Sequence, residues 1–368
     1  MSYNKPQPIK NLPPVWLIKA INSFRAFLLQ LNRKLFPGNV VLYEQFQYFW
    51  LLPSLYVAAK LDIATLLKEK PLTAAEISDC IHVDSSNVLR LLRALASQGI
   101  FRQMKDGRYC LNGMSKALLD KQGSLRYMIL HHLGPVNWNL MSNLEVAVKT
   151  GMDPFKERYG AVIYEYLKDH PAEYELFDKS MSNLSELGLA PILNAYNFSK
   201  YKVVADIGGG EGFLLANILK NNPGSTGILF DTTEAVAKAP EILAVHKALN
   251  RTKIIAGDFF KTIPVEANIY ILKNIIHNWS DEDCLIILSN ISKNMLADSR
   301  LLIVEMVVPP GNTPSLSKLL DIQMMAAMHG GKERTAVEFE TILVKAGFTL
   351  PTIIPTIAPI CLIEAKKQ

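Results

Sequence analysis

Three side chains that can transfer protons fall where predicted strands end or in the loops beyond them. His277 follows the apolar segment 268–273, Glu305 ends the next apolar segment, and Glu333 precedes a predicted helix. Because ligands in open α/β sheets bind beyond the carboxyl ends of the strands, these groups can meet at one rim. A neutral imidazole there can take the proton of a phenolic hydroxyl, and a carboxylate on its other nitrogen would fix the tautomer. Taken alone, His277 is better explained as a cap of a turn, so the interpretation depends on its surroundings.

A glycine-rich turn follows the first strand of the same predicted sheet. It reads Asp206-Ile-Gly-Gly-Gly-Glu-Gly212 and contains Gly208 and Gly210. Glycines between a strand and a helix let a ligand approach the backbone amides closely. The dinucleotide fingerprint G-x-G-x-x-G fails, because counting from Gly208 puts Phe213 in place of its last glycine. The turn therefore favours a nucleoside that carries an amino acid instead of a pyrophosphate.

Two further strand ends carry side chains that suit a nucleoside. Asp231 lies 25 residues after Asp206, where a carboxylate can accept hydrogen bonds from both ribose hydroxyls, although an exposed helix cap is the alternative. Asp258 and Phe259 end the following strand, where an acid beside an aromatic ring can hold the amino group and the face of adenine. Each position is weak evidence alone, but the three strand ends in register indicate one nucleoside site.

The elements around these residues alternate between strands and helices. Strands are predicted over 201–207, 226–231, 253–259, 268–273 and 300–305. This alternation predicts an α/β fold with a Rossmann-like, doubly wound parallel sheet in a domain over 199–368. The last two apolar segments, 349–356 and 359–367, have no helix between them and predict a hairpin that closes the edge of the sheet.

Upstream, residues 71–112 have the pattern of a winged helix-turn-helix within an N-terminal all-α domain. Thr73 and Glu76 can form a capping box, Asp84 can cap a second helix, and an Asp-Gly turn joins two short strands as the wing. DNA binding is the alternative to a structural role. The second helix, however, offers only two basic side chains and is apolar on too many sides to lie in a groove. We therefore expect a buried, dimer-forming role and no nucleic-acid partner.

The N-terminal extension contains a predicted amphipathic helix. Apolar residues recur at alternating spacings of four and three from Leu17 to Leu35, before Pro37-Gly38 ends the helix. Packing of this apolar seam against the body of the protein or a partner subunit is the favoured interpretation. The alternative is a basic helix, over 15–36, that lies weakly on a membrane surface.

Composition and charge argue against several classes of protein. The 368 residues, 49% of them hydrophobic and 20% charged, can bury a large core and suit two domains. Six cationic residues precede the first acidic one, Glu44, so the net charge of +5 leaves about −1 for the rest of the chain, too little for a phosphate-binding surface. Four scattered cysteines indicate neither a disulfide framework nor a metal site. Without a signal peptide or a long uncharged segment, a cytoplasmic protein is expected.

The motifs around the candidate residues resemble those of one enzyme family. The segments VVADIGGGEGFLLANIL, LFDTTEAV, GDFF, ILKNIIHNWSDEDC, LLIVEMVVP and DIQMMAAMHGGKERTAVEFETILVKAGF are similar to successive motifs of the plant caffeate-type and bacterial hydroxyneurosporene-type O-methyltransferases. The likeness covers roughly residues 45–365. It implies S-adenosyl-L-methionine as cofactor and a homodimer formed through the winged-helix domain. It also implies a metal-free reaction in which His277, between Glu305 and Glu333, deprotonates the acceptor.

The same resemblance assigns binding residues. It implies cofactor roles for Gly208, Asp231, Asp258, Phe259 and Lys273, and the glycine-rich turn itself adds Asp206 and Gly210 as candidates. Met181 and Met324 match positions that hold the acceptor ring between thioethers, although methionine at helical spacing is more often plain core. With Met328 and Trp138 they form an apolar lining, which predicts a small aromatic or lipophilic secondary metabolite that carries a hydroxyl. The resulting domain division is 1–40, 41–115, a substrate-lining helical region over 116–198, and 199–368.

Two departures from the family pattern leave the reaction open. The usual His-Asp-Trp is His277-Asn278-Trp279, and Met328 stands where plant enzymes often have an asparagine. Both changes make the acceptor side less polar. Some relatives with this fold hydroxylate or decarboxylate their substrates instead. Methyl transfer to nitrogen or carbon also stays open, as does a regulator that senses a nucleoside.

Overall fold

The computed structural model describes residues 12–368, which form two compact units. The first unit comprises the chain up to Ser23, 143–163 and 188–368, and the second comprises 24–142 and 164–187. Two helices, α1 (Val15–Lys34) and α12 (Pro171–Ala195), belong partly to each unit. The finer domain division that the sequence suggests stays a prediction.

The first unit is built on one mixed eight-stranded sheet in the order β5-β4-β3-β6-β7-β10-β9, with β8 paired to β7. The strands up to β7 run parallel, and β10 and β9 form an antiparallel hairpin beside β7. The predicted alternation and the predicted hairpin are therefore confirmed, whereas β8 was not predicted. The strands are β3 (Val203–Ile207), β4 (Thr226–Asp231), β5 (Thr252–Ala256), β6 (Ile269–Lys273), β7 (Arg300–Val308), β8 (Arg334–Thr335), β9 (Thr352–Pro355) and β10 (Ile360–Lys366).

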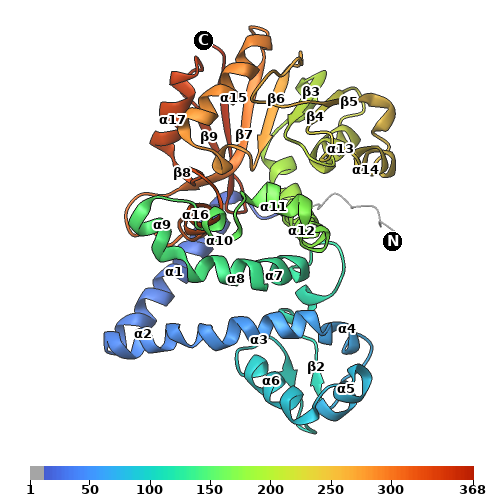
Figure 1. Cartoon of the computed structure of the whole chain (residues 1–368), viewed down its shortest axis with the longest axis vertical. Helices are drawn as coiled ribbons and strands as arrows, with labels where there is room; N and C mark the ends of the chain where they lie inside the picture. The colour runs from blue at the N-terminus through green and yellow to red at the C-terminus, as the bar shows by residue number, and fades with distance from the viewer. Residues whose placement is uncertain (1–11) are drawn as a thin grey trace. The chain divides into compact units, whose positions relative to one another are not determined.

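Helices cover both faces of this sheet (Figure 1). Side chains alternate along each strand, so Val204 and Ile271 pack in one apolar cluster with α13 (Phe213–Asn221) and α14 (Ala239–Val245). Their neighbours along the strands pack on the opposite face with α15 (Asp281–Asn294) and α17 (Ala336–Lys345). The carboxyl ends of the parallel strands therefore meet at one rim. The unit also contains α9 (Leu144–Thr150), α10 (Pro154–Tyr159) and α16 (Leu316–Ala327).

The second unit contains the predicted winged helix. Thr73 and Glu76 form a complete capping box, Asp84 accepts a hydrogen bond from the third residue of the next helix, and two short antiparallel strands form the wing. These elements are α5 (Ala74–Ile81), α6 (Ser85–Ser97), β1 (Arg102–Gln103) and β2 (Tyr109–Cys110). The others are α2 (Gly38–Phe46), α3 (Tyr48–Lys60), α4 (Ile63–Leu66), α7 (Arg126–His132), α8 (Pro135–Ser142) and most of α11 (Ile163–Asp169).

The three N-terminal helices expose many large apolar side chains. The predicted amphipathic helix is present as α1, but most of its apolar seam is accessible, as Phe24 and Leu28 illustrate. Within residues 12–368, no helix is long and apolar enough to cross a membrane. The exposed apolar residues on α2 and α3 are Val40, Leu42, Tyr43, Phe46, Tyr48, Phe49, Trp50 and Val57.

Candidate active site

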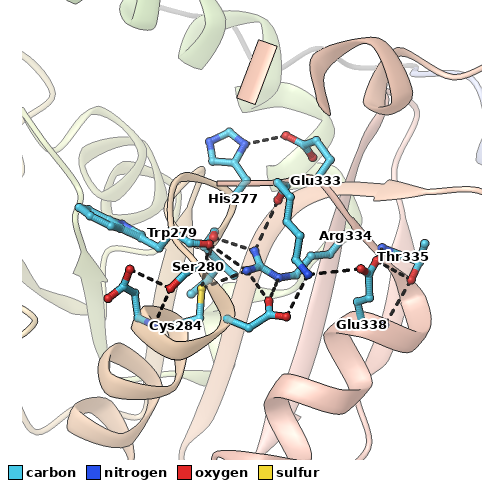
Figure 2. A network of polar contacts seen from close by, with 12 residues as sticks. His277, Trp279, Ser280, Cys284, Glu333, Arg334, Thr335 and Glu338 are labelled. Carbon is cyan, nitrogen blue, oxygen red and sulfur yellow. Dashed lines mark hydrogen bonds and ion pairs between the residues drawn. The ribbon is translucent and has the colours of Figure 1, made fainter. Parts of the chain in front are cut away.

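The three predicted catalytic residues come together at the carboxyl end of β6. His277 lies on a single helical turn, η4 (Ile276–Asn278), just beyond that strand. Its Nδ1 is 2.7 Å from Oε1 of Glu333 (Figure 2). Glu305, near the end of β7, instead accepts the backbone N–H of His277 at 3.1 Å. One carboxylate therefore orients the imidazole ring and the other fixes the backbone that carries it.

Burial and charge set the protonation of this group. The His277 side chain is 14% exposed and that of Glu333 only 1%, so the histidine is the member of the pair that a ligand can reach. Among the described residues, nothing forms a hydrogen bond with its second ring nitrogen, Nε2. Burial alone would lower the pKa of His277, but the hydrogen bond with Glu333 and the charges of Glu305 and Glu333 raise it above its ordinary value.

The segment that carries Glu333 is held close to the His277 turn. The backbone N–H of Lys332 donates to the carbonyl oxygen of His277 at 2.9 Å, and that of Glu333 donates to Oδ1 of Asp321 at 2.8 Å. Only glycine fits at position 331, because a Cβ there would lie 2.8 Å from the His277 carbonyl oxygen. Asp321 is the first residue of the motif that contains Glu333, but the sequence analysis assigned it no role.

Several glycines of the glycine-rich turn have left-handed backbone conformations. Gly208 has φ +69°, and a Cβ there would lie 2.5 Å from Cδ1 of Ile275. Gly210 is also left-handed, with φ +57° and open space around its Cα. Its backbone N–H donates to Oδ2 of Asp231 at 2.8 Å. This hydrogen bond joins the turn to the end of β4, and the nucleoside site itself stays a prediction.

A buried carboxyl group lies at the start of this turn. Asp206 is 1% exposed, and its Oδ2 has no hydrogen-bond partner among residues 12–368. Burial raises the pKa of Asp206 to about 7, and burial lowers the pKa of Lys273 to about 8. The carboxyl group also accepts a backbone hydrogen bond from Leu215 and lies near the charge of Lys273, so Oδ2 is the atom left for a donor on a ligand. S-adenosylmethionine carries both an ammonium and a sulfonium, so the residues of this loop fit that cofactor.

Aromatic rings pack together around Phe259, which the sequence analysis predicts to stack on adenine. The ring of Phe259 lies 6.0 Å from that of Trp279 in an edge-on arrangement, and the ring of Phe260 lies 4.7 Å from Trp279. Asp258 accepts the backbone N–H of Phe260 at 2.9 Å and is only partly buried. Sequence reasoning did not assign Phe260 or Trp279 to the site, although Trp279 follows the histidine in the same motif.

The four predicted acceptor-lining residues are divided between the units. Met324 is buried in α16 and Met328 caps the end of that helix, both in the first unit. Met181 and Trp138 are partly buried in the second unit, where the Trp138 ring lies 6.4 Å from that of Phe49. Ser180 and Asn183, on either side of Met181, were not predicted; both are buried and contain side-chain oxygens without a hydrogen-bond partner in the described part of the chain.

Comparison with known proteins identifies the family of this chain. The family model for an O-methyltransferase domain matches residues 141–349, and that for an O-methyltransferase dimerisation domain matches 43–121. A phenazine O-methyltransferase from Lysobacter antibioticus is 33% identical over 90% of this chain and 96% of its own length. An 8-amino-8-demethylriboflavin N,N-dimethyltransferase from Streptomyces davaonensis is 31% identical over 82% of this chain and 87% of its own.

A solved structure agrees with the fold and the cofactor. CalO1, a methyltransferase in calicheamicin biosynthesis solved with S-adenosylhomocysteine, superposes with a TM-score of 0.81 at 31% identity over 90% of this chain and 98% of that one. The fold of the sheet, the position of the glycine-rich turn and the two matched family models all indicate the same family. The chain therefore belongs to the O-methyltransferase family, as an S-adenosylmethionine-dependent methyltransferase with an N-terminal dimerisation domain.

Proposed function

We propose that this enzyme methylates a hydroxyl group of a small aromatic or lipophilic secondary metabolite, with His277 as the general base. The observation that carries the proposal is the 2.7 Å contact between Nδ1 of His277 and Oε1 of the buried Glu333. This contact keeps the Nδ1 proton in place and leaves the lone pair on Nε2. The base then lies beside the glycine-rich turn, since Ile275, two residues before it, contacts the Gly208 position.

Side chains of this protein can remove the proton of the acceptor hydroxyl. Nε2 of His277 takes the proton of the acceptor hydroxyl, and Glu333 stabilises the imidazolium that forms. Glu305 keeps the backbone of the base in place through the His277 N–H. When bound, S-adenosylmethionine supplies a methyl group on a sulfonium for the acceptor oxygen to displace. The remaining contribution of the protein is orientation of the two reactants.

The cofactor site follows from the same rim. We assign the carboxylate of Asp231 to the ribose hydroxyls, since its Oδ2 already accepts the N–H of Gly210 and faces the turn. Asp206 and Lys273 would hold the amino-acid end of the cofactor. Asp258 and Phe259 would hold the adenine, with Gly208 and Gly210 leaving room for the backbone approach.

The acceptor side combines thioethers with two unpaired polar groups. Met181, Met324, Met328 and Trp138 are proposed to line it. Oγ of Ser180 and Oδ1 of Asn183 project from the same side of α12, one turn apart, and have no partner within the described chain. Buried polar atoms without partners are rare in folded proteins, so these two are proposed to bind a polar group of the acceptor.

Transfer to nitrogen is the second candidate function. The riboflavin-type relative named above is an N,N-dimethyltransferase, and an amine acceptor would make a smaller demand on the base. Incubation with labelled S-adenosylmethionine and an extract of the source organism, followed by product identification, separates the two. A labelled methoxy product that His277→Ala no longer forms supports the proposal, whereas an N-methyl product or an unaffected variant contradicts it.

We infer a homodimer as the functional form. The match to a dimerisation domain and the exposed apolar side chains of α1, α2 and α3 support this assembly. A stable monomer at micromolar concentration in light scattering would contradict it.

Deletion of residues 1–36 distinguishes the roles of the N-terminal helix: loss of dimer stability supports packing, and loss of liposome binding supports the membrane alternative. We also propose that the protein is cytoplasmic and has no nucleic-acid partner.

A further inference from the structure

A fully buried arginine lies immediately after Glu333. The side chain of Arg334, on β8, is 0% exposed, and its guanidinium contacts the segment that surrounds His277 (Figure 2). Nη1 donates to the carbonyl oxygen of Ile276 at 2.8 Å, and Nη2 donates to that of Trp279 at 2.9 Å. Nε and Nη2 also donate to Oδ1 of Asp281, at 3.0 and 2.7 Å.

These acceptors lie on both sides of the proposed base. Ile276 precedes His277, Trp279 follows it by two residues, and Asp281 begins α15. A guanidinium has five N–H donors in one rigid plane, so it can bind all three acceptors at once, which a lysine ammonium on a flexible chain cannot do. The single side chain therefore fixes both ends of the turn that carries the histidine.

The same residue is joined through one peptide bond to the carboxylate that orients the ring. Glu333 and Arg334 are consecutive, so the position of the guanidinium sets where the Glu333 carboxylate can lie relative to the turn. β8 pairs with the end of β7, at Val307 and Val308, which anchors this segment to the sheet that also carries Glu305. Arg334 itself does not contact the imidazole ring.

We propose that Arg334 is a positioning residue for methyl transfer: it holds the His277 turn against the Glu333 segment so that Nδ1 stays bonded to the carboxylate and Nε2 faces the acceptor. The inference rests on the proposed role of His277 as the base. Displacement of a reacting group by about 1 Å can cost roughly 100-fold in rate, so loss of this clamp should affect turnover more than cofactor binding.

The primary test is Arg334→Lys, which keeps the positive charge and removes the planar set of N–H donors. Asp281 retains Lys332 as an ion-pair partner at 2.9 Å, so this variant leaves no lone buried carboxylate there. We expect kcat to fall about 10- to 100-fold while the Kd for S-adenosylmethionine stays within about twofold. Because the hydrogen bond with Glu333 raises the pKa of His277, its weakening should move the acidic limb of the kcat profile to lower pH.

Arg251→Lys is the matched control. Arg251 also donates to backbone carbonyls, those of Leu219, Asn222 and Ser225, but it precedes β5 at the opposite end of the sheet. It should lower the melting temperature without moving kcat or the pH profile. If Arg334→Lys behaves in the same way as Arg251→Lys, Arg334 has only a structural role and the proposal is wrong. If Arg334→Lys does not fold, Asp281→Asn, which weakens the same clamp from the other side, is expected to give a smaller loss of kcat with the same pH shift, and an unchanged profile contradicts the proposal.

A double variant separates this inference from the proposed function. In a His277→Ala background, Arg334→Lys should cause no further loss of kcat, because a clamp that acts through the base has nothing left to position. An additive loss would overturn the positioning role. An unaffected His277→Ala single variant would overturn the base assignment instead.

Discussion

Glu305 contacts His277 at its backbone and not at its ring, since Oε1 of Glu305 accepts the main-chain N–H at 3.1 Å. Within residues 12–368, the ring forms its one hydrogen bond with Glu333. The sequence motifs do not distinguish the two glutamates, but their contacts differ. Glu333 orients the imidazole ring and favours its charged form, whereas Glu305 holds the main chain of His277 in place.

Glu333→Gln should accordingly change the pH dependence of the reaction. The hydrogen bond and charge of Glu333 raise the pKa of His277, and the base works only when neutral. Removing the charge lowers that pKa, so the acidic limb of the kcat profile should move to lower pH while the plateau falls. Glu305→Gln also removes a charge that raises this pKa, but the ring contact remains, so its plateau should fall less. The check is kcat of both variants measured from pH 5 to 9. Equal plateau values of kcat for Glu333→Gln and Glu305→Gln would contradict the different roles of the two glutamates.

His277→Ala should abolish most turnover and leave the affinity for S-adenosylmethionine nearly unchanged. General-base catalysis typically contributes about 100- to 10,000-fold, and a loss of that size in kcat is expected at pH 7. Activity should partly recover at high pH, where a phenolic acceptor ionises without help. Wild-type turnover at pH 7 on the identified acceptor would remove His277 from the mechanism.

Asp231→Ala should weaken cofactor binding more than tenfold, because hydrogen bonds to a charged acceptor are worth about 1.5 to 3 kcal/mol. Calorimetry gives the affinity directly. Glu234→Ala is the control, since it removes an exposed negative charge three residues away. An unchanged Kd for Asp231→Ala, or an equal effect of both variants, would exclude Asp231 from the ribose site.

Cofactor affinity should increase as pH rises through about 7. Burial raises the pKa of Asp206 to about 7 in the cofactor-free site, whereas a bound cationic cofactor favours the ionised carboxylate. Binding should then release protons below that pH, which calorimetry in buffers of different ionisation enthalpy detects. Asp206→Asn should bind more weakly and lose this dependence. The same pH dependence in the variant would show that another group is responsible.

Ser180→Ala should raise the acceptor KM without lowering the melting temperature. The Ser180 hydroxyl is buried without a hydrogen-bond partner in the described chain, so its removal costs the free enzyme little, whereas a bond to the acceptor is worth about 1 kcal/mol. Ser182→Ala, an exposed serine of the same helix, is the control. An unchanged acceptor KM would show that the Ser180 hydroxyl is not part of the acceptor site.

The sequence predicts the strands of the sheet more completely than the contacts of the site. Apolar segments and their spacing predict strands β3, β4 and β6, because those strands are buried on both faces and the local sequence pattern follows burial. The capping box of Thr73 and Glu76 is equally local and is confirmed. These features depend on residues within one or two turns of each other.

The contacts that decide the chemistry depend on distant segments. Glu333 is 56 residues from His277, and no local pattern indicates whether a carboxylate reaches the ring or the backbone. Strand β8, at two residues, is too short to leave a periodic signal, so the burial of Arg334 beside the base could not be inferred. A charged residue in a polar segment normally suggests a solvated surface.

The division of the chain into interleaved units bears on how new acceptors arise. The base, its carboxylates and all cofactor candidates belong to the first unit, whereas Met181 and Trp138 belong to the second. The proposed acceptor role of Met181 and Trp138 implies that substitutions in 24–142 and 164–187 can alter substrate choice without changing the proposed base or cofactor residues. Since the second unit is two separate stretches of sequence and Met324 and Met328 belong to the first unit, recombination between relatives would have to exchange three segments to transfer the whole proposed lining.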